Sequence, residues 1–163
     1  MILSGQTPDQ EQLVHEVLDR FARAGLDLPP LTITFWPNRD GCEDMGGLHR
    51  GLGDIEVCIP KARMIAHEIG HAWDVHTLTD ADREAYRRLW DAPTWGSHDF
   101  EWQERATELA ANTIAFSVLN DDPEPYRQIL MYVCTFESLT DRPLPTPVVG
   151  PCPQPRHPGL GSE

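Results

Sequence analysis

Two spacings of hydrophobic residues alternate along the chain and predict where helices and strands lie. Apolar residues recur every three or four positions across residues 8–24, after a capping threonine at Thr7, as in an amphipathic helix. They alternate with polar residues across 31–36 and 54–59, as in half-buried strands. Helical spacing then returns in four later segments, 61–77, 80–90, 100–119 and 125–139. The pattern therefore predicts a chain of helices with two strands near its beginning.

Two segments follow neither spacing. Residues 38–53 are rich in glycine and aspartate, which predicts a long loop or an irregular hairpin. Residues 142–163 hold seven prolines and three glycines, a composition that does not build a packed element. We therefore expect a single domain over residues 1–141, followed by a tail that is an extended cover or disordered.

The helix expected at 61–77 has two faces of different character. Plotted at 100° per residue, its bulky apolar side chains, Ile65, Ile69 and Trp73 among them, fall on one face and predict core contacts. The opposite face carries four polar residues: His67, Glu68, His71 and Asp74. Gly70 lowers helix stability relative to alanine, but it allows a neighbouring element to approach closely. This helix is therefore expected to be half core and half functional site.

The polar face contains the motif His67-Glu68-Ile69-Gly70-His71. Two histidines four positions apart on a helix project from the same face, so their imidazoles can converge on one metal ion. In this HExxH pattern of zinc peptidases, zinc lowers the pKa of a bound water and the glutamate accepts its proton. The motif predicts Zn²⁺ bound by His67 and His71, with Glu68 as the general base.

A catalytic zinc site needs a third protein ligand. His76 follows His71 by five positions, out of the metzincin frame, and points about 180° away from His67 on a continuous helix. The segment Asp-Gly-Cys-Glu-Asp at 40–44 matches the cysteine segment of peptide deformylases only in part and at an unsuitable spacing. The remaining candidate type is a glutamate on a later helix, as in thermolysin-like enzymes.

The helix expected at 100–119 offers three glutamates on one stripe, Glu101, Glu104 and Glu108. Glu108 is favoured because Asn112 lies one turn further on, where its amide oxygen can accept a hydrogen bond from a ligand histidine. The small residue Ala111 on the same stripe allows two helices to pack closely. Glu104 is the alternative third ligand, with Glu108 then acting as its hydrogen-bonding partner.

The motif followed by Glu108-Leu-Ala-Ala-Asn112-Thr-Ile-Ala115 resembles the gluzincin group of zinc metallopeptidases. More closely, it resembles small bacterial domains with HExGH and a later ExxANxxA, such as the ImmA/IrrE-type peptidases and related predicted peptidases of actinobacteria and their phages. The resemblance implies His67, His71 and Glu108 as zinc ligands and Glu68 as the base. Asn112 falls where thermolysin-like enzymes carry an aspartate.

The same resemblance implies an α+β, minimal zincin-like fold. A small mixed or antiparallel sheet would pack on the motif helix, with further helices towards the C-terminus. The strand at 54–59 would border the cleft as an edge strand and pair with an extended substrate. Besides zinc, the oxyanion formed during hydrolysis needs a hydrogen-bond donor. The candidates are His98, Tyr132 and His157, and the sequence does not distinguish between them. Asp74 is expected to orient His71 or a substrate group, or to be a solvated carboxylate.

The expected function is zinc-dependent hydrolysis of a peptide or protein. The alternatives are a non-catalytic zinc-binding regulatory domain, and a peptidase inhibited by its own tail. A formal charge of −13 over 163 residues argues against nucleic acid or an anionic membrane as the main partner, and favours basic or neutral substrates.

The cysteines and the N-terminal sequence bear on the cellular compartment. No apolar run approaches the ~20 residues of a membrane span, and the N-terminal residues lack the features of a signal peptide, which favours the cytoplasm. Cys42 with Cys58, and Cys134 with Cys152, are the pairs favoured by proximity if the cysteines are oxidised. Such pairing would indicate a secreted protein whose leader has been removed, whereas reduced thiols are the other interpretation.

Overall fold

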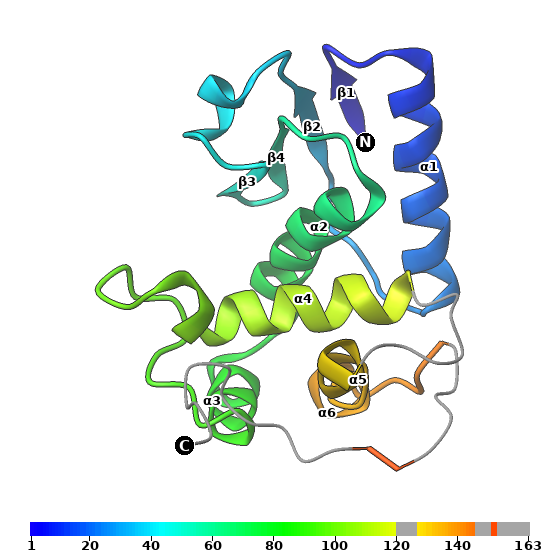
Figure 1. Cartoon of the computed structure of the whole chain (residues 1–163). Coiled ribbons are helices and arrows are strands. Elements are labelled where there is room, and N and C mark those ends of the chain that lie inside the picture. Colours follow the sequence, from blue (N-terminus) through cyan, green and yellow to red (C-terminus); the bar gives the residue numbers. More distant parts are fainter. Residues whose placement is uncertain (120–126, 146–150, 153–163) are drawn as a thin grey trace.

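The computed structural model describes residues 1–119, 127–145 and 151–152, which form an α+β fold (Figure 1). Its α-helices are α1 (Pro8–Arg23), α2 (Ala62–Thr77), α3 (Asp80–Leu89), α4 (Ala106–Val118), α5 (Arg127–Val133) and α6 (Phe136–Thr140). Its strands are β1 (Ile2–Ser4), β2 (Thr32–Phe35), β3 (Gly47–Gly51) and β4 (Asp54–Val57). Two 3-10 helices also form, η1 (Arg39–Cys42) and η2 (Trp102–Glu104).

The four strands form one mixed sheet in the order β1-β2-β4-β3. Strand β2 pairs in parallel with both β1 and β4, and β3 pairs antiparallel with β4. The strand expected at 54–59 is therefore inside the sheet, and the prediction that it forms the edge is wrong. The edge strands are β1 and β3, and β3 lies within the segment expected to be a loop or hairpin. Its sequence, Gly-Leu-His-Arg-Gly, lacks the apolar alternation that predicts a strand.

Helix α2 lies between the sheet and α4, which crosses it (Figure 1). On its other side α4 contacts α3, α5 and α6. The apolar face of α2 is buried as predicted, with Ile65 and Ile69 fully inaccessible and Trp73 2% exposed. The opposite face of α2 lies next to β3 and the first turns of α4. This arrangement places the polar residues of α2 between the edge of the sheet and a second helix.

The predicted helices at 8–24, 61–77 and 80–90 form close to their expected positions, and two others differ. The helix expected from residue 100 begins only at Ala106, because Arg105 is extended (φ −89°, ψ 125°) and its guanidinium donates to the Phe100 carbonyl. The helix expected over 125–139 is divided into α5 and α6. Thr135, at the break, donates to the Tyr132 carbonyl and joins a buried hydroxyl network with Tyr86. Residues 125–126 lie outside the described residues.

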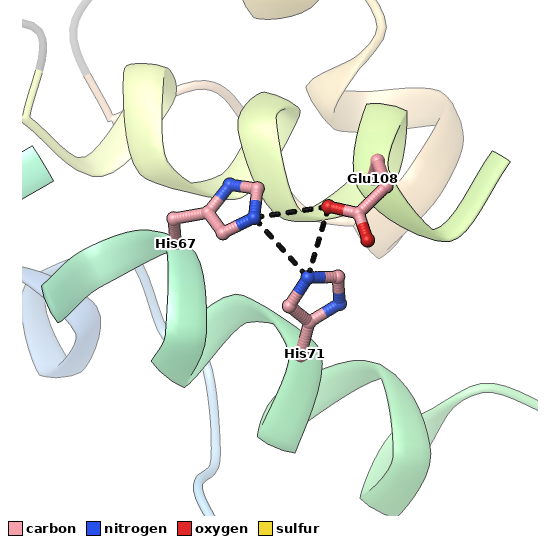
Figure 2. Close-up of side chains that lie close together, drawn as sticks. All are labelled: His67, His71 and Glu108. Atoms are coloured by element: carbon pink, nitrogen blue, oxygen red, sulfur yellow. Dashed lines mark hydrogen bonds and ion pairs between the residues drawn. The ribbon is translucent and has the colours of Figure 1, made fainter. Parts of the chain in front are cut away.

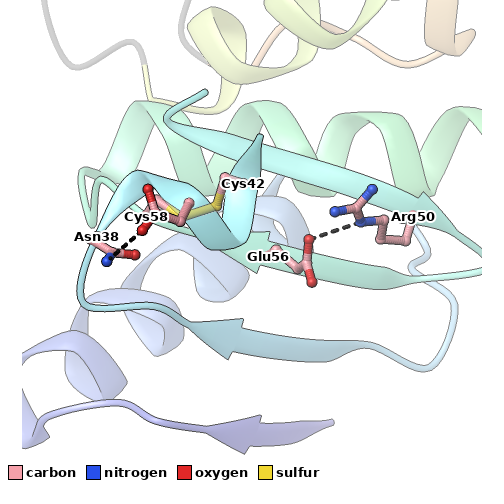
Figure 3. The surroundings of a disulfide bond; sticks show 6 residues. Asn38, Cys42, Arg50, Glu56 and Cys58 are labelled. Carbon is pink, nitrogen blue, oxygen red and sulfur yellow. Dashed lines mark hydrogen bonds and ion pairs between the residues drawn. A yellow bond between two sulfur atoms is a disulfide. The ribbon is translucent and has the colours of Figure 1, made fainter. Parts of the chain in front are cut away.

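Both proposed cysteine pairs form disulfides. The bond between Cys42 and Cys58 ties η1 to the end of β4 (Figure 3). The bond between Cys134 and Cys152 ties the C-terminal segment to the end of α5. In the same segment Leu144 packs against the core, so this part of the expected tail is attached to the domain.

Within the described residues, no helix combines the length and the apolar character needed to cross a membrane.

Candidate metal centre

Three side chains from two helices meet at one point between α2 and α4 (Figure 2). The Nε2 atoms of His67 and His71 lie 3.1 Å apart, and Glu108 Oε2 lies 3.1 Å from the first and 3.2 Å from the second. His67 and Glu108 are each 9% exposed, and His71 is partly buried. The helix spacing predicted that His67 and His71 share one face of α2. The residue that joins them is Glu108, the favoured of the two candidate glutamates, in the first turn of α4.

The chemistry of these three atoms fits a metal ion. Each histidine forms a contact from Nδ1 to another residue, so Nε2 presents its lone pair to the centre. Three acceptor atoms in mutual contact repel one another unless a cation or a proton lies between them. Tetrahedral zinc bound to imidazole and carboxylate has ligand atoms about 3.3 Å apart, close to the separations here. His67, His71 and Glu108 can therefore hold a metal ion.

Asn112 holds His67 in this orientation. Its Oδ1 atom lies 3.1 Å from His67 Nδ1, where it accepts the ring N–H. The Asn112 amide also interacts with the Tyr132 hydroxyl. Tyr132, one of the expected oxyanion donors, packs its ring against Trp90 and Phe116 at centroid distances of 5.3 and 5.4 Å. Tyr132, in α5, therefore packs on α4 and supports Asn112.

Thr107 holds His71, and the sequence analysis did not single it out. Its hydroxyl lies 3.3 Å from His71 Nδ1 and donates to Asp74 Oδ2 at 3.2 Å. Arg83 Nε in turn donates to Asp74 Oδ1 at 3.0 Å. Asp74 is only 2% exposed, so it is not a solvated carboxylate; it acts on His71 through Thr107. The sequence signal that could have identified Thr107 is its position directly before Glu108 in the same helix.

Burial and the two histidines set the protonation of the carboxylates. Burial alone would raise the pKa of Glu108, but hydrogen bonds from His67 and His71 outweigh it and lower that pKa to about 2. Burial lowers the pKa of His71, but the hydrogen bond and charge of Glu108 outweigh it and raise that pKa. Burial raises the pKa of Glu68, and the charges of His67 and His71 offset part of that rise. Without an ion, His71 therefore holds its proton more tightly than a free imidazole does.

A cavity of about 220 Å³ opens beside the three ligand side chains, and Glu68 and His98 are among the residues that line it. Strand β3 forms one wall of this cavity through Gly47 and His49. A Cβ atom at Gly47 would lie 2.8 Å from Glu68 Oε1, so only glycine leaves room for that carboxylate. The close passage of β3 therefore determines where Glu68 can lie.

His49 is a second residue that the sequence analysis missed. Its ring stacks on that of His71 with centroids 6.1 Å apart. Its Nε2 atom is buried and has no hydrogen-bond partner among the described residues. Burial, followed by the charge of His71, lowers its pKa to about 4, so the ring is neutral at pH 7. The sequence did not indicate His49 because residues 38–53 were interpreted as a loop or irregular hairpin.

Other candidate residues lie away from the centre. Glu104, the alternative third ligand, accepts a hydrogen bond from the Glu101 N–H in η2 and does not join the cluster. His76 is exposed on the outer face of α2, as its spacing predicted. His157 lies outside the described residues.

No family model matches this chain, and no curated protein or solved structure shows significant similarity to it. The functional interpretation therefore rests on the residues and geometry of the site.

Proposed function

We propose that this protein is a zinc-dependent peptidase in which His67, His71 and Glu108 bind the ion and Glu68 is the general base. The observation that carries the proposal is the position of Glu68. Its carboxylate lines the cavity and is within electrostatic reach of all three ligand residues. A site that bound a metal only for stability would have no need of a base at its open side.

Each residue has a defined part in the proposed hydrolysis. Bound Zn²⁺ would supply Lewis acidity, lowering the pKa of a water to about 7 and polarising the substrate carbonyl. Glu68 accepts the proton of the attacking water and then delivers it to the amine that leaves. Asn112 and Thr107 keep the Nδ1 atoms of the two histidines protonated, so that the Nε2 lone pairs point to the ion.

Strand β3 supports a peptide as the substrate. It is the edge strand beside the cavity, and its His49 backbone N–H donates to Glu68. An extended peptide can bind along such an edge through main-chain hydrogen bonds. We therefore propose that β3, in place of residues 54–59, is the strand that positions a peptide or protein substrate.

The two disulfides support an oxidising compartment, such as the exterior of the cell, for this proposed peptidase. This replaces the cytoplasmic expectation, which rested on the N-terminal sequence.

Metal analysis and hydrolysis of a peptide library test the proposal together. Glu68→Gln is expected to bind one equivalent of zinc without hydrolysing peptides, since the amide cannot accept the proton. Glu108→Ala is expected to lose zinc affinity, and Glu104→Ala is the matched control that retains it. Full hydrolysis by Glu68→Gln would overturn the mechanism. Zinc binding by the wild type with no hydrolysis would favour the non-catalytic domain instead.

The tail-inhibited alternative has its own test. The described tail residues, 142–145 and 151–152, are not among the described residues that line the cavity beside the ligands. Removal of the chain after Leu144 is therefore expected to leave hydrolysis unchanged. A large gain in activity on truncation would instead identify the tail as an inhibitor.

A further inference from the structure

A second, larger cavity of about 450 Å³ adjoins the first on the side of Asn112. The two cavities share five lining residues: Met45, Gly47, His67, Glu68 and Trp102. The larger cavity extends from Glu68 towards η1 and the first turn of α2. A peptide bound along β3 past Glu68 can therefore place a side chain in this cavity.

Two arginines line this cavity. Arg39 begins η1 and Arg63 lies in the first turn of α2, and both line the cavity. Neither guanidinium forms an ion pair with a described carboxylate, and that of Arg63 lies over the Phe116 ring at 5.2 Å. By contrast, ion pairs with acids are formed by Arg50, Arg83, Arg87 and Arg88, all in the part of the chain that the structure describes. Two guanidinium groups that have no ion pair with a described carboxylate therefore line the cavity next to the proposed catalytic base.

The rest of the lining limits what can bind there. Asp44 also lines the cavity and is exposed, as Arg39 and Arg63 are, whereas Glu68 is buried at its inner end. Met45, Met64 and Trp102 supply apolar surface between these ends. A carboxylate on a short aliphatic stem matches both parts, since the stem contacts the apolar side chains and the charge meets a guanidinium.

We propose that this cavity binds an acidic side chain, aspartate or glutamate, of the peptide substrate, and that Arg63 and Arg39 determine this specificity. The inference rests on the proposed peptidase function. It also reverses the expectation, drawn from the net charge of −13, that basic or neutral substrates are favoured. The overall charge acts at long range and is screened by salt within about 10 Å, whereas the arginines act in direct contact.

The first test is the cleavage pattern of zinc-loaded protein on a pool of random octapeptides with blocked ends, identified by mass spectrometry. Acidic residues are expected to be enriched about two- to fivefold at one position within three residues of the cut, as an exposed charge pair of about 0.5–1 kcal/mol implies. Arg63→Gln and Arg39→Gln are each expected to reduce the enrichment, and Arg63→Lys to retain part of it. Arg88→Gln, which removes an exposed arginine far from the cavity, is the matched control.

The second test measures binding without hydrolysis. Zinc-loaded Glu68→Gln is titrated with blocked peptide pairs that differ only by glutamate or glutamine, with tryptophan fluorescence, to which Trp102 in the cavity contributes, as one readout. Tighter binding of the acidic peptide that weakens with salt and in Arg63→Gln supports the inference. Equal binding of both peptides overturns it.

Different results would overturn the peptidase function and the acidic specificity. Hydrolysis with no acidic enrichment, or an enrichment that survives both glutamine variants, overturns the specificity and leaves the peptidase function intact. Absence of hydrolysis by the zinc-loaded wild type overturns the peptidase function, and the binding measurement then decides whether the cavity selects acidic ligands.

Discussion

Gly70 of α2 lies so close to Ala111 of α4 that a Cβ atom at Gly70 would be 3.1 Å from the Ala111 Cα and 3.2 Å from its carbonyl oxygen. Gly70 directly precedes His71, and Ala111 follows Glu108 by three positions. The close crossing of the two helices therefore lies beside the ligand atoms and sets how near Glu108 comes to the histidines. Because Gly70 has a hydrogen atom where alanine would have a methyl group, α2 and α4 approach closely enough to bring Glu108 to the two histidines.

Gly70→Ala is expected to lower the free energy of unfolding by about 1–3 kcal/mol, because the methyl group meets backbone atoms of α4, which can make room only if the helix itself shifts. This loss outweighs the ~1 kcal/mol gained from the helix propensity of alanine. Zinc affinity should fall as α4 moves away. Gly96→Ala is the control, since its Cβ would meet only the Thr107 methyl at 3.5 Å. Calorimetry and chelator competition measure both effects, and unchanged affinity in Gly70→Ala would contradict this view of the crossing.

Asn112→Ala is expected to weaken zinc binding by about 10–100-fold, since His67 loses the acceptor that holds its ring. Asn112→Asp should restore the affinity or exceed that of the wild type, because a carboxylate accepts the same hydrogen bond and makes the imidazole more basic. Competition with a fluorescent chelator measures both variants. Equal affinities in the wild type and Asn112→Ala would show that Asn112 does not orient the ligand.

Thr107→Val keeps the shape of the side chain but removes the hydroxyl between His71 and Asp74. We expect a loss of about 1–3 kcal/mol in stability, because the buried Asp74 carboxylate loses a donor, together with weaker zinc binding. Thr140→Val is the control: its hydroxyl donates to the Phe136 carbonyl in α6, so only stability should change. If both variants bound zinc as the wild type does, the contact with Thr107 would have no role in positioning His71.

The stability of the metal-free protein is expected to fall as the pH rises above 6.5. The pKa of His71 is lowered by burial but raised overall by Glu108, so folding holds this proton more tightly than the unfolded chain does. The associated stabilisation is complete below pH 6.5 and is lost as the pH passes the folded pKa. Zinc displaces this proton, so the increase in melting temperature on adding zinc should grow with pH. Thermal melts with EDTA or zinc between pH 5 and 8 test both trends; in Glu108→Gln the metal-free dependence should be weaker.

The disulfide between Cys42 and Cys58 is expected to support the arginine side of the larger cavity as well as the fold. The two bonds span similar sequence separations, 16 and 18 residues, so removing either should cost about 3 kcal/mol. Only the Cys42→Ala/Cys58→Ala variant should also reduce discrimination between acidic and neutral peptides, because Arg39 lies in η1. Denaturation and peptide binding, compared with Cys134→Ala/Cys152→Ala, separate the two effects. Equal discrimination in both variants would show that the bond does not position Arg39.

The periodicity of the sequence was sufficient where the structure depends on neighbours along the chain. A helix repeats every 3.6 residues, so the spacing of His67, His71 and Asp74 placed them on one face of α2 before any packing was known. The same rule placed Asn112 one turn beyond Glu108. It failed for α4, which begins later than expected, since the extended conformation of Arg105 and its bonds to Phe100 override the helical pattern.

What the sequence determined by itself was therefore the two helix faces that carry the candidate metal ligands, because backbone hydrogen bonds within a helix are local. Tertiary structure alone decided the rest of the site. Strand β3 exists because it pairs with β4, and only that pairing brings Gly47 and His49 against Glu68. The contact of Thr107 with Asp74 joins residues 33 positions apart, and Arg39 reaches the same cleft as Arg63 through the sheet and a disulfide. Contacts of this kind depend on how distant segments pack, which no local spacing encodes.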